Sequence, residues 1–126
     1  QPGVPHVKEF VEAIKKKTGR VPTARTWFGF VGTWSCALAA NKAKSLEAIK
    51  MAKALSGMEL PPEVGLMPNT PFYRADQNQL IGSLYVGNAQ AKGAQPDDLF
   101  HVTKVVNGKD IAGTVQQSGC KMTWPT

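Results

Sequence analysis

Residues 26–41 form a stretch of sixteen positions without a charged side chain, and charged residues flank it on both sides. Its large apolar residues point to every side of a helical wheel; they are Trp27, Phe28, Phe30, Val31, Trp34, Cys36 and Leu38. A helix that is apolar all round either crosses a membrane or forms the centre of a core. A span needs about 18 or more apolar residues, and two threonines and a serine interrupt this stretch. The sequence therefore predicts a buried helix, with Thr23 as its N-cap.

One amphipathic helix is expected before this stretch and another after it. Residues 5–18 place four apolar residues on one face at helical spacing, namely Val7, Phe10, Val11 and Ile14. Gly19 can end this helix as its C-terminal cap. After a polar break at residues 41–44, Ser45 can cap a third helix over residues 46–56, and Gly57 can end it.

The second half of the chain changes its period. Three short segments are rich in β-branched and aromatic residues and are expected to be strands; they are residues 70–75, 80–86 and 100–106. Asn107-Gly108 favours a tight turn, so residues 102–106 and 109–112 are expected to pair as a hairpin. Three short strands cannot cover a helix that is apolar all round, and the chain is therefore expected to be incomplete as a folding unit.

The formal charge of +6 is concentrated in the first half of the chain. Ten basic and three acidic residues occur up to Lys53, against five basic and six acidic residues after it. A basic half can indicate nucleic-acid binding, and a small basic nucleic-acid-binding protein is one alternative. Single-strand binders interleave aromatic and basic residues, but the aromatic residues here gather in the uncharged stretch. We therefore expect no nucleic-acid partner.

No arrangement of residues typical of catalysis is present, and we expect neither an enzyme nor a cofactor. His6 and His101 are isolated, and no glycine-rich phosphate loop or Gly-x-Ser-x-Gly elbow occurs. Cys36 and Cys120 lack the spacing of a zinc site, so no metal is expected. The residues alone leave one disulfide or two free thiols as alternatives for this pair.

Several stretches, read in order, resemble one known family. Residues 7–30 match its helix, glycine, proline and aromatic entry into a buried helix, and residues 36–58 match its small-residue helix followed by a surface helix. Further likeness is carried by Arg74, Asp76, Gln77 and Gln79, by Asn78 where the family often has His, and by residues 102–112. The chain resembles the C-terminal third of a type I periplasmic solute-binding protein of an ABC transporter, of the branched-chain amino acid and amide-binding kind.

This resemblance implies an α/β fold in which two lobes, joined by three crossovers, close on a small amino-acid-like or amide-like solute. Residues 1–58 would form the helical part of the first lobe, and residues 59–126 the strands near the hinge and the tail. The implied location is periplasmic. The implied partners are the solute, the membrane subunits of an ABC transporter, and either the remaining N-terminal part of the protein or a second copy of this chain. A ligand-sensing receptor or regulator module of the same fold is the alternative.

The resemblance also implies site residues. In the family, the aromatic start of the buried helix approaches the cleft, which points to Trp27, Phe28 and Phe30 as ligand-binding residues; core packing is the alternative role for each. A disulfide between Cys36 and Cys120 is expected as well, and it would require an oxidising compartment.

Overall fold

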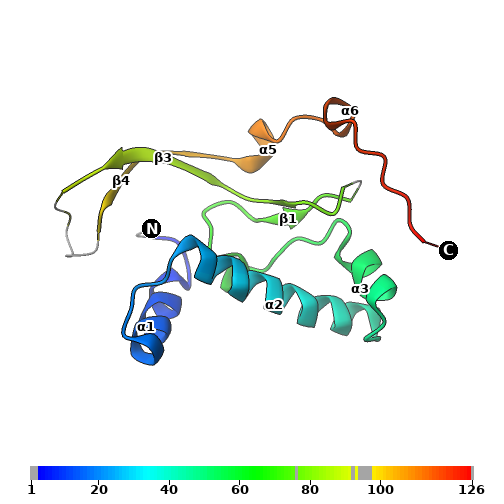
Figure 1. Cartoon of the computed structure of the whole chain (residues 1–126), viewed down its shortest axis with the longest axis horizontal. Helices are drawn as coiled ribbons and strands as arrows, with labels where there is room; N and C mark the ends of the chain where they lie inside the picture. The colour runs from blue at the N-terminus through cyan, green and yellow to red at the C-terminus, as the bar shows by residue number, and fades with distance from the viewer. Residues whose placement is uncertain (1–2, 76, 92, 94–97, 126) are drawn as a thin grey trace.

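A computed structural model of the chain describes residues 3–75, 77–91, 93 and 98–125. Four helices precede the strands, namely α1 (Val7–Thr18), α2 (Ala24–Ala43), α3 (Ala48–Leu55) and α4 (Pro62–Gly65). Four strands follow, namely β1 (Phe72–Tyr73), β2 (Leu80–Ile81), β3 (Leu84–Ala89) and β4 (Phe100–Val106). Two short helices, α5 (Gly108–Ile111) and α6 (Val115–Ser118), lie in the C-terminal segment. The long helix α2 runs beneath the strands, and β3 and β4 extend as a ribbon beyond the N-terminal end of α2 (Figure 1).

Helix α2 begins where the sequence predicted. The hydroxyl of Thr23 accepts the N–H of Thr26 and the Thr26 hydroxyl accepts the N–H of Thr23, which makes a capping box. The helix continues through residues 41–43, so the polar break predicted at residues 41–44 does not interrupt it. No helix in the described part of the chain is long and apolar enough to cross a membrane.

Burial of α2 is confined to one face, which corrects the expectation of a helix buried all round. Its fully buried residues are Val31, Ser35 and Ala39, spaced four residues apart. Two of the large aromatic residues on other sides remain exposed, Phe28 at 62% and Trp34 at 47%. This agrees with the expectation that the strands of this chain cannot cover every side of α2.

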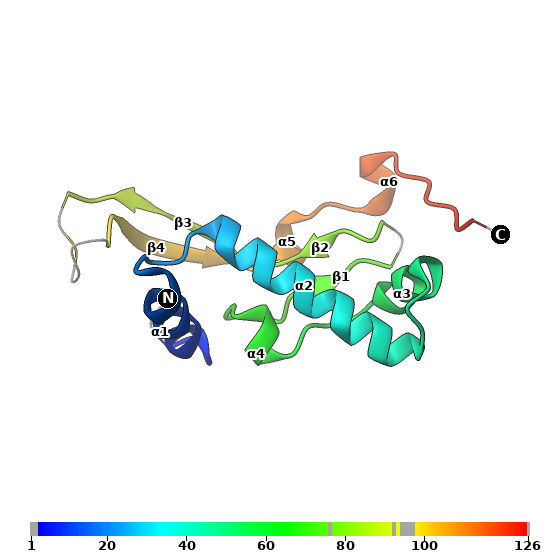
Figure 2. The same cartoon turned by 60° about the horizontal axis from the view of Figure 1, so that its bottom comes forward.

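The core lies between α2 and the segment that contains α4, β1 and β2. Val31 of α2 packs with Leu60 and Val64, each about 1% exposed. Five partly buried residues pack around these three, namely Trp27, Phe30, Leu38, Tyr73 and Leu80. The N–H of Leu60 donates to the carbonyl of Pro71 at 2.8 Å. The chain before α4 therefore runs beside β1, and Figure 2 shows α4 next to α2.

The flanking helices are confirmed, although each begins two residues later than predicted, α1 at Val7 instead of residue 5 and α3 at Ala48 instead of residue 46. Helix α1 ends at Gly19, which adopts φ 70° and donates its N–H to the carbonyl of Lys15 at 2.8 Å. Leu46 precedes α3 and is 86% exposed instead of facing the core. The Ser45 hydroxyl accepts the N–H of Glu47 in the turn before the helix.

The strands form two separate antiparallel pairs, β1 with β2 and β3 with β4. The predicted strand over residues 80–86 is broken at Gly82 and Ser83, so that its first part pairs with β1 and its second part continues as β3. In the β3–β4 ribbon the register shifts between Val86 and Gly87, which marks a bulge.

The predicted hairpin at Asn107-Gly108 is wrong. The Asn107 side chain accepts the N–H of Lys109 at 3.1 Å and caps α5, so the chain turns into a helix there. Gly108 is buried, and a Cβ at this position would lie 2.2 Å from the carbonyl oxygen of Gly82. The close approach of Gly108 to Gly82 brings the end of β4 next to the start of β3. Strand β4 therefore pairs with β3 and not with residues 109–112.

The predicted disulfide is not formed in the structure, where Cys36 and Cys120 are free and exposed. Cys36 belongs to α2, whereas Cys120 follows α6. Both views place the β1–β2 hairpin between α2 and α6 (Figures 1 and 2). A disulfide requires Cα atoms within about 7 Å, and this layer separates the two helices. The C-terminal segment is attached to the hairpin instead, because Arg74 donates to the carbonyl of Gly113 at 3.1 Å.

Truncating the core leucine tests this packing. Leu60→Ala is expected to lower the free energy of unfolding by about 2–5 kcal/mol, because it leaves a cavity against Val31 and Val64. Leu46→Ala is the matched control, since Leu46 is 86% exposed, and should change stability by no more than about 0.5 kcal/mol. Urea denaturation followed by circular dichroism measures both, and equal effects of the two substitutions would contradict this core.

Thiol labelling tests the state of the cysteines. Because both thiols are free and exposed, iodoacetamide is expected to modify Cys36 and Cys120 in the folded chain without a reductant. Intact mass spectrometry counts the labels. A chain that takes up no label until it is reduced would instead contain the disulfide.

Candidate functional site

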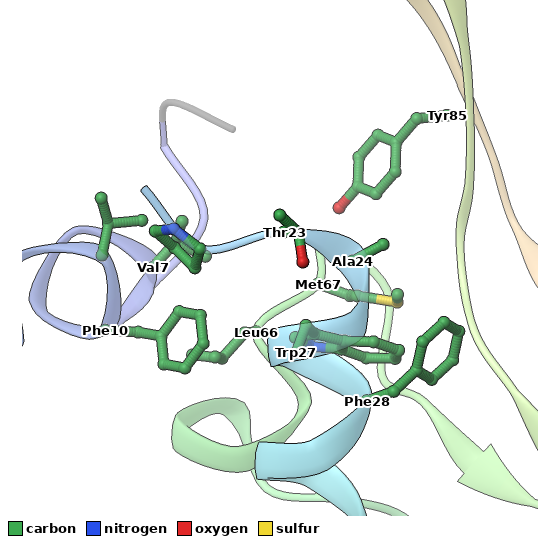
Figure 3. A pocket seen from close by; sticks show the side chains of 11 residues that line it. Val7, Phe10, Thr23, Ala24, Trp27, Phe28, Leu66, Met67 and Tyr85 are labelled. Carbon is green, nitrogen blue, oxygen red and sulfur yellow. The ribbon is translucent and has the colours of Figure 1, made fainter. Parts of the chain in front are cut away.

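An apolar pocket of about 310 Å³ lies where α1, the start of α2 and β3 approach one another (Figure 3). Helix α1 contributes its apolar face, and the loop after α4 and strand β3 complete the lining. The lining residues are Val7, Phe10, Val11, Pro22, Thr23, Ala24, Trp27, Phe28, Leu66, Met67 and Tyr85. Small-molecule sites in proteins have volumes of about 300–1,000 Å³ and mostly apolar walls, so this pocket is at the small end of that range.

Two of the sequence-predicted ligand residues, Trp27 and Phe28, line this pocket. The indole N–H of Trp27 donates to the carbonyl of Gly65 at 3.0 Å, which fixes the ring between α2 and the turn of α4. The Phe28 ring meets the Trp27 ring edge-on, with centroids 5.0 Å apart. Trp27 thus combines core packing with a face on the pocket, whereas Phe28 is 62% exposed.

The third sequence-predicted residue, Phe30, is not part of the pocket lining. Its ring packs on Phe10 of α1, with centroids 4.9 Å apart, and on Trp34 at 6.4 Å. Because Phe10 does line the pocket, Phe30 contributes to the site by supporting a wall residue.

The loop after α4 supplies a wall that the sequence analysis missed. Leu66 ends α4 in the left-handed region, at φ 53°, with its N–H donated to the carbonyl of Pro62 at 3.1 Å. This conformation is uncommon for a bulky residue, and it turns the chain so that Leu66 and Met67 face the pocket. Pro62 occupies the first position of α4, where proline is common because its missing N–H would have no partner within the helix.

Tyr85 is the second element of the site that the sequence analysis missed. It comes from β3, and Figure 3 shows its ring reaching from the strand towards Thr23 and Met67. Burial raises the pKa of its phenol above the usual 10.0, because the charged form would lose water. The alternation of side chains along β3 could have placed Tyr85 on the inner face of the ribbon, but nothing local indicated which element that face meets.

The lining of this pocket is largely apolar. None of the described residues that line the pocket is charged. His6 lies outside the lining, exposed, with Nδ1 2.9 Å from the Glu9 carboxylate. In the described part of the chain, no three His, Cys, Asp or Glu side chains gather in a way that could hold a metal ion. The pocket can therefore take an uncharged group and shield it from water.

No family model and no curated protein matches this sequence. Several solved structures resemble it in fold, including the two that follow. An ABC-type branched-chain amino acid transporter from Rhodopseudomonas palustris superposes with a TM-score of 0.70 and 22% identity, over 86% of this chain and 28% of that one. An amino acid ABC transporter substrate-binding protein from Pseudomonas fluorescens gives 0.69 and 25% identity, over 85% of this chain and 28% of that one.

The chain therefore has the fold of part of an ABC transporter substrate-binding protein, as the sequence predicted. It spans about 28% of the length of each of these two neighbours.

Removing the indole N–H of Trp27 tests whether its hydrogen bond to Gly65 stabilises the wall of the pocket. Trp27→Phe is expected to destabilise the chain by about 1–3 kcal/mol, because the carbonyl of the buried Gly65 loses its partner. Trp34→Phe makes the same change in shape at a position that is 47% exposed, and should cost about 0.5 kcal/mol or less. Urea unfolding of the two variants gives the comparison, and a Trp27→Phe variant as stable as the control would contradict the anchoring role.

Proposed function

We propose that this chain is part of an extracytoplasmic solute-binding component of an ABC importer, which binds a small amino-acid-like or amide-like solute between two lobes. The observation that carries the proposal is an apolar pocket with Trp27 and Phe28 in its wall, in a fold shared with amino acid substrate-binding proteins. A pocket of this kind retains a small apolar group by removing it from water. In this proposal the pocket binds a solute and catalyses no reaction.

The proposed arrangement assigns residues 1–58 to the helical part of the first lobe and residues 59–126 to the strands near the hinge and the tail. The exposed side of α2 that includes Trp34 would be covered by the remaining N-terminal part of a longer protein or by a second copy. Membrane subunits of an ABC transporter would receive the solute.

Several lysines have contacts within the fold, which weakens the nucleic-acid-binding alternative. Three lysines at residues 15–17 occupy the last turn of α1, where positive charge stabilises the helix end. Lys42 donates to the carbonyl of Ala54 at 2.9 Å, and Lys50 pairs with Glu47 at 2.7 Å. These contacts account for several of the basic residues within the fold itself.

Titration of tryptophan fluorescence in the intact protein tests the proposal. Addition of L-leucine, L-valine, L-phenylalanine or acetamide is expected to change the emission for at least one solute, because the Trp27 ring lines the pocket. Phe28→Ala should weaken that affinity by about tenfold, corresponding to about 1.4 kcal/mol of lost apolar contact. Trp27→Phe should remove most of the signal.

Trp34→Phe is the control, since Trp34 lies outside the pocket lining; the solute-dependent change should persist in this variant. A Trp27→Phe variant that keeps both signal and affinity would refute the assignment of Trp27. If none of these solutes binds, the proposed solute class is wrong.

A further inference from the structure

The polar groups in the pocket lining differ in whether they already have a partner. Three side chains in the lining carry a hydrogen-bonding group, those of Thr23, Trp27 and Tyr85. The Thr23 hydroxyl accepts the N–H of Thr26, and the Trp27 indole donates to Gly65. Among the described residues, the Tyr85 hydroxyl has no hydrogen-bond partner. A ligand in this pocket could therefore form a hydrogen bond with the Tyr85 hydroxyl.

The backbone of the ribbon fixes the direction of Tyr85. Leu84 and Val86 are exposed, whereas Tyr85 and Gly87 are partly buried, so the inner face of β3 carries the tyrosine. Tyr85 pairs with Val105 on β4. Two residues further on, the strands approach so closely that a Cβ on Gly87 would lie 2.1 Å from the carbonyl oxygen of His101. This tight packing next to the bulge holds the position from which the ring projects.

At neutral pH the Tyr85 hydroxyl is a neutral group that can both donate and accept a hydrogen bond. Burial raises its pKa, which keeps it protonated. Because the described lining carries no charge, a carboxylate or ammonium group would lose its water there without gaining a partner of opposite charge. The pocket thus combines an apolar body with one neutral polar group.

We propose that Tyr85 determines the specificity of this pocket, which selects an uncharged aromatic or aliphatic group that carries one hydroxyl or carbonyl oxygen. A purely apolar group of the same shape would leave the desolvated Tyr85 hydroxyl unpaired, which costs affinity. The volume of about 310 Å³ is enough for a substituted benzene ring, since a cavity of about 150 Å³ already takes benzene.

This inference rests on the proposed solute-binding function and makes it more specific. If the solute is an amino acid, this pocket receives its side chain, and the charged amino and carboxylate groups lie outside the pocket. A phenol-like side chain fits best, because it supplies a flat apolar ring for Trp27 and Phe28 and an oxygen for Tyr85.

A titration with two ligands of nearly the same shape tests the inference. Amide chemical shifts of the ¹⁵N-labelled 126-residue chain are followed by NMR as p-cresol or toluene is added. Both ligands should shift the amides around Thr23, Ala24 and Met67. Tyr85→Phe should weaken p-cresol binding roughly two- to tenfold, the equivalent of one hydrogen bond, and leave toluene binding unchanged or slightly stronger.

The other tyrosine gives a matched control. Tyr73 packs on the core and does not line the pocket, so Tyr73→Phe should leave the ratio of the two affinities as in the unmodified chain. An equal effect of Tyr85→Phe on both ligands would overturn the role of Tyr85 while retaining the pocket. Shifts outside the pocket, or no shifts with either ligand at millimolar concentration, would overturn the inference altogether. The proposed function is judged separately, by the amino acid and amide titrations.

Discussion

The contact between α2 and the turn formed by residues 60–66 connects the two halves of the chain. Val31 packs on Leu60 and Val64, and the Trp27 indole donates to the Gly65 carbonyl. The apolar contact supplies most of the stabilisation, because it removes three side chains almost completely from water. The hydrogen bond fixes the orientation of the Trp27 indole ring. The pocket exists because this contact places the first turn of α2 against α1 on one side and β3 on the other.

The helices were predictable from the sequence, because their signals are local. Apolar spacing and a C-terminal glycine located α1, and Thr23 located the start of α2. The strands were less predictable, because pairing depends on distant partners. Asn107-Gly108 fits a hairpin turn by residue type, but the buried contact of Gly108 with Gly82 makes it the start of a helix instead. The resemblance supplied the fold class, and the free cysteines differ from what it implied.

Of the eleven residues that line the pocket, two were named from the sequence as candidate ligand residues. Trp27 and Phe28 follow from the aromatic start of α2, and both line the pocket. Phe30 shares their composition and neighbourhood but lies on another side of the helix, against Phe10. The opposite wall, made by Leu66, Met67 and Tyr85, depends on a left-handed residue and on the course of the ribbon. Alternation along β3 indicates the face on which Tyr85 lies. Which element that face meets is set by packing between segments far apart in the chain, as is the left-handed backbone of Leu66.

The chain around α4 contains one position, Met67, at which the size of this pocket can change. Gly65 cannot accept a larger residue, because a Cβ there would lie 2.7 Å from the Pro71 ring, and Leu66 is committed by its left-handed backbone. Met67 is different, since its thioether rests against Gly82, where a Cβ would lie 2.8 Å from the sulfur. Methionine is unbranched and adaptable, so exchanges at this position would deepen or shorten the cavity without disturbing the anchored indole. The size of the group that this pocket accepts can therefore change through a single residue, while the scaffold stays the same.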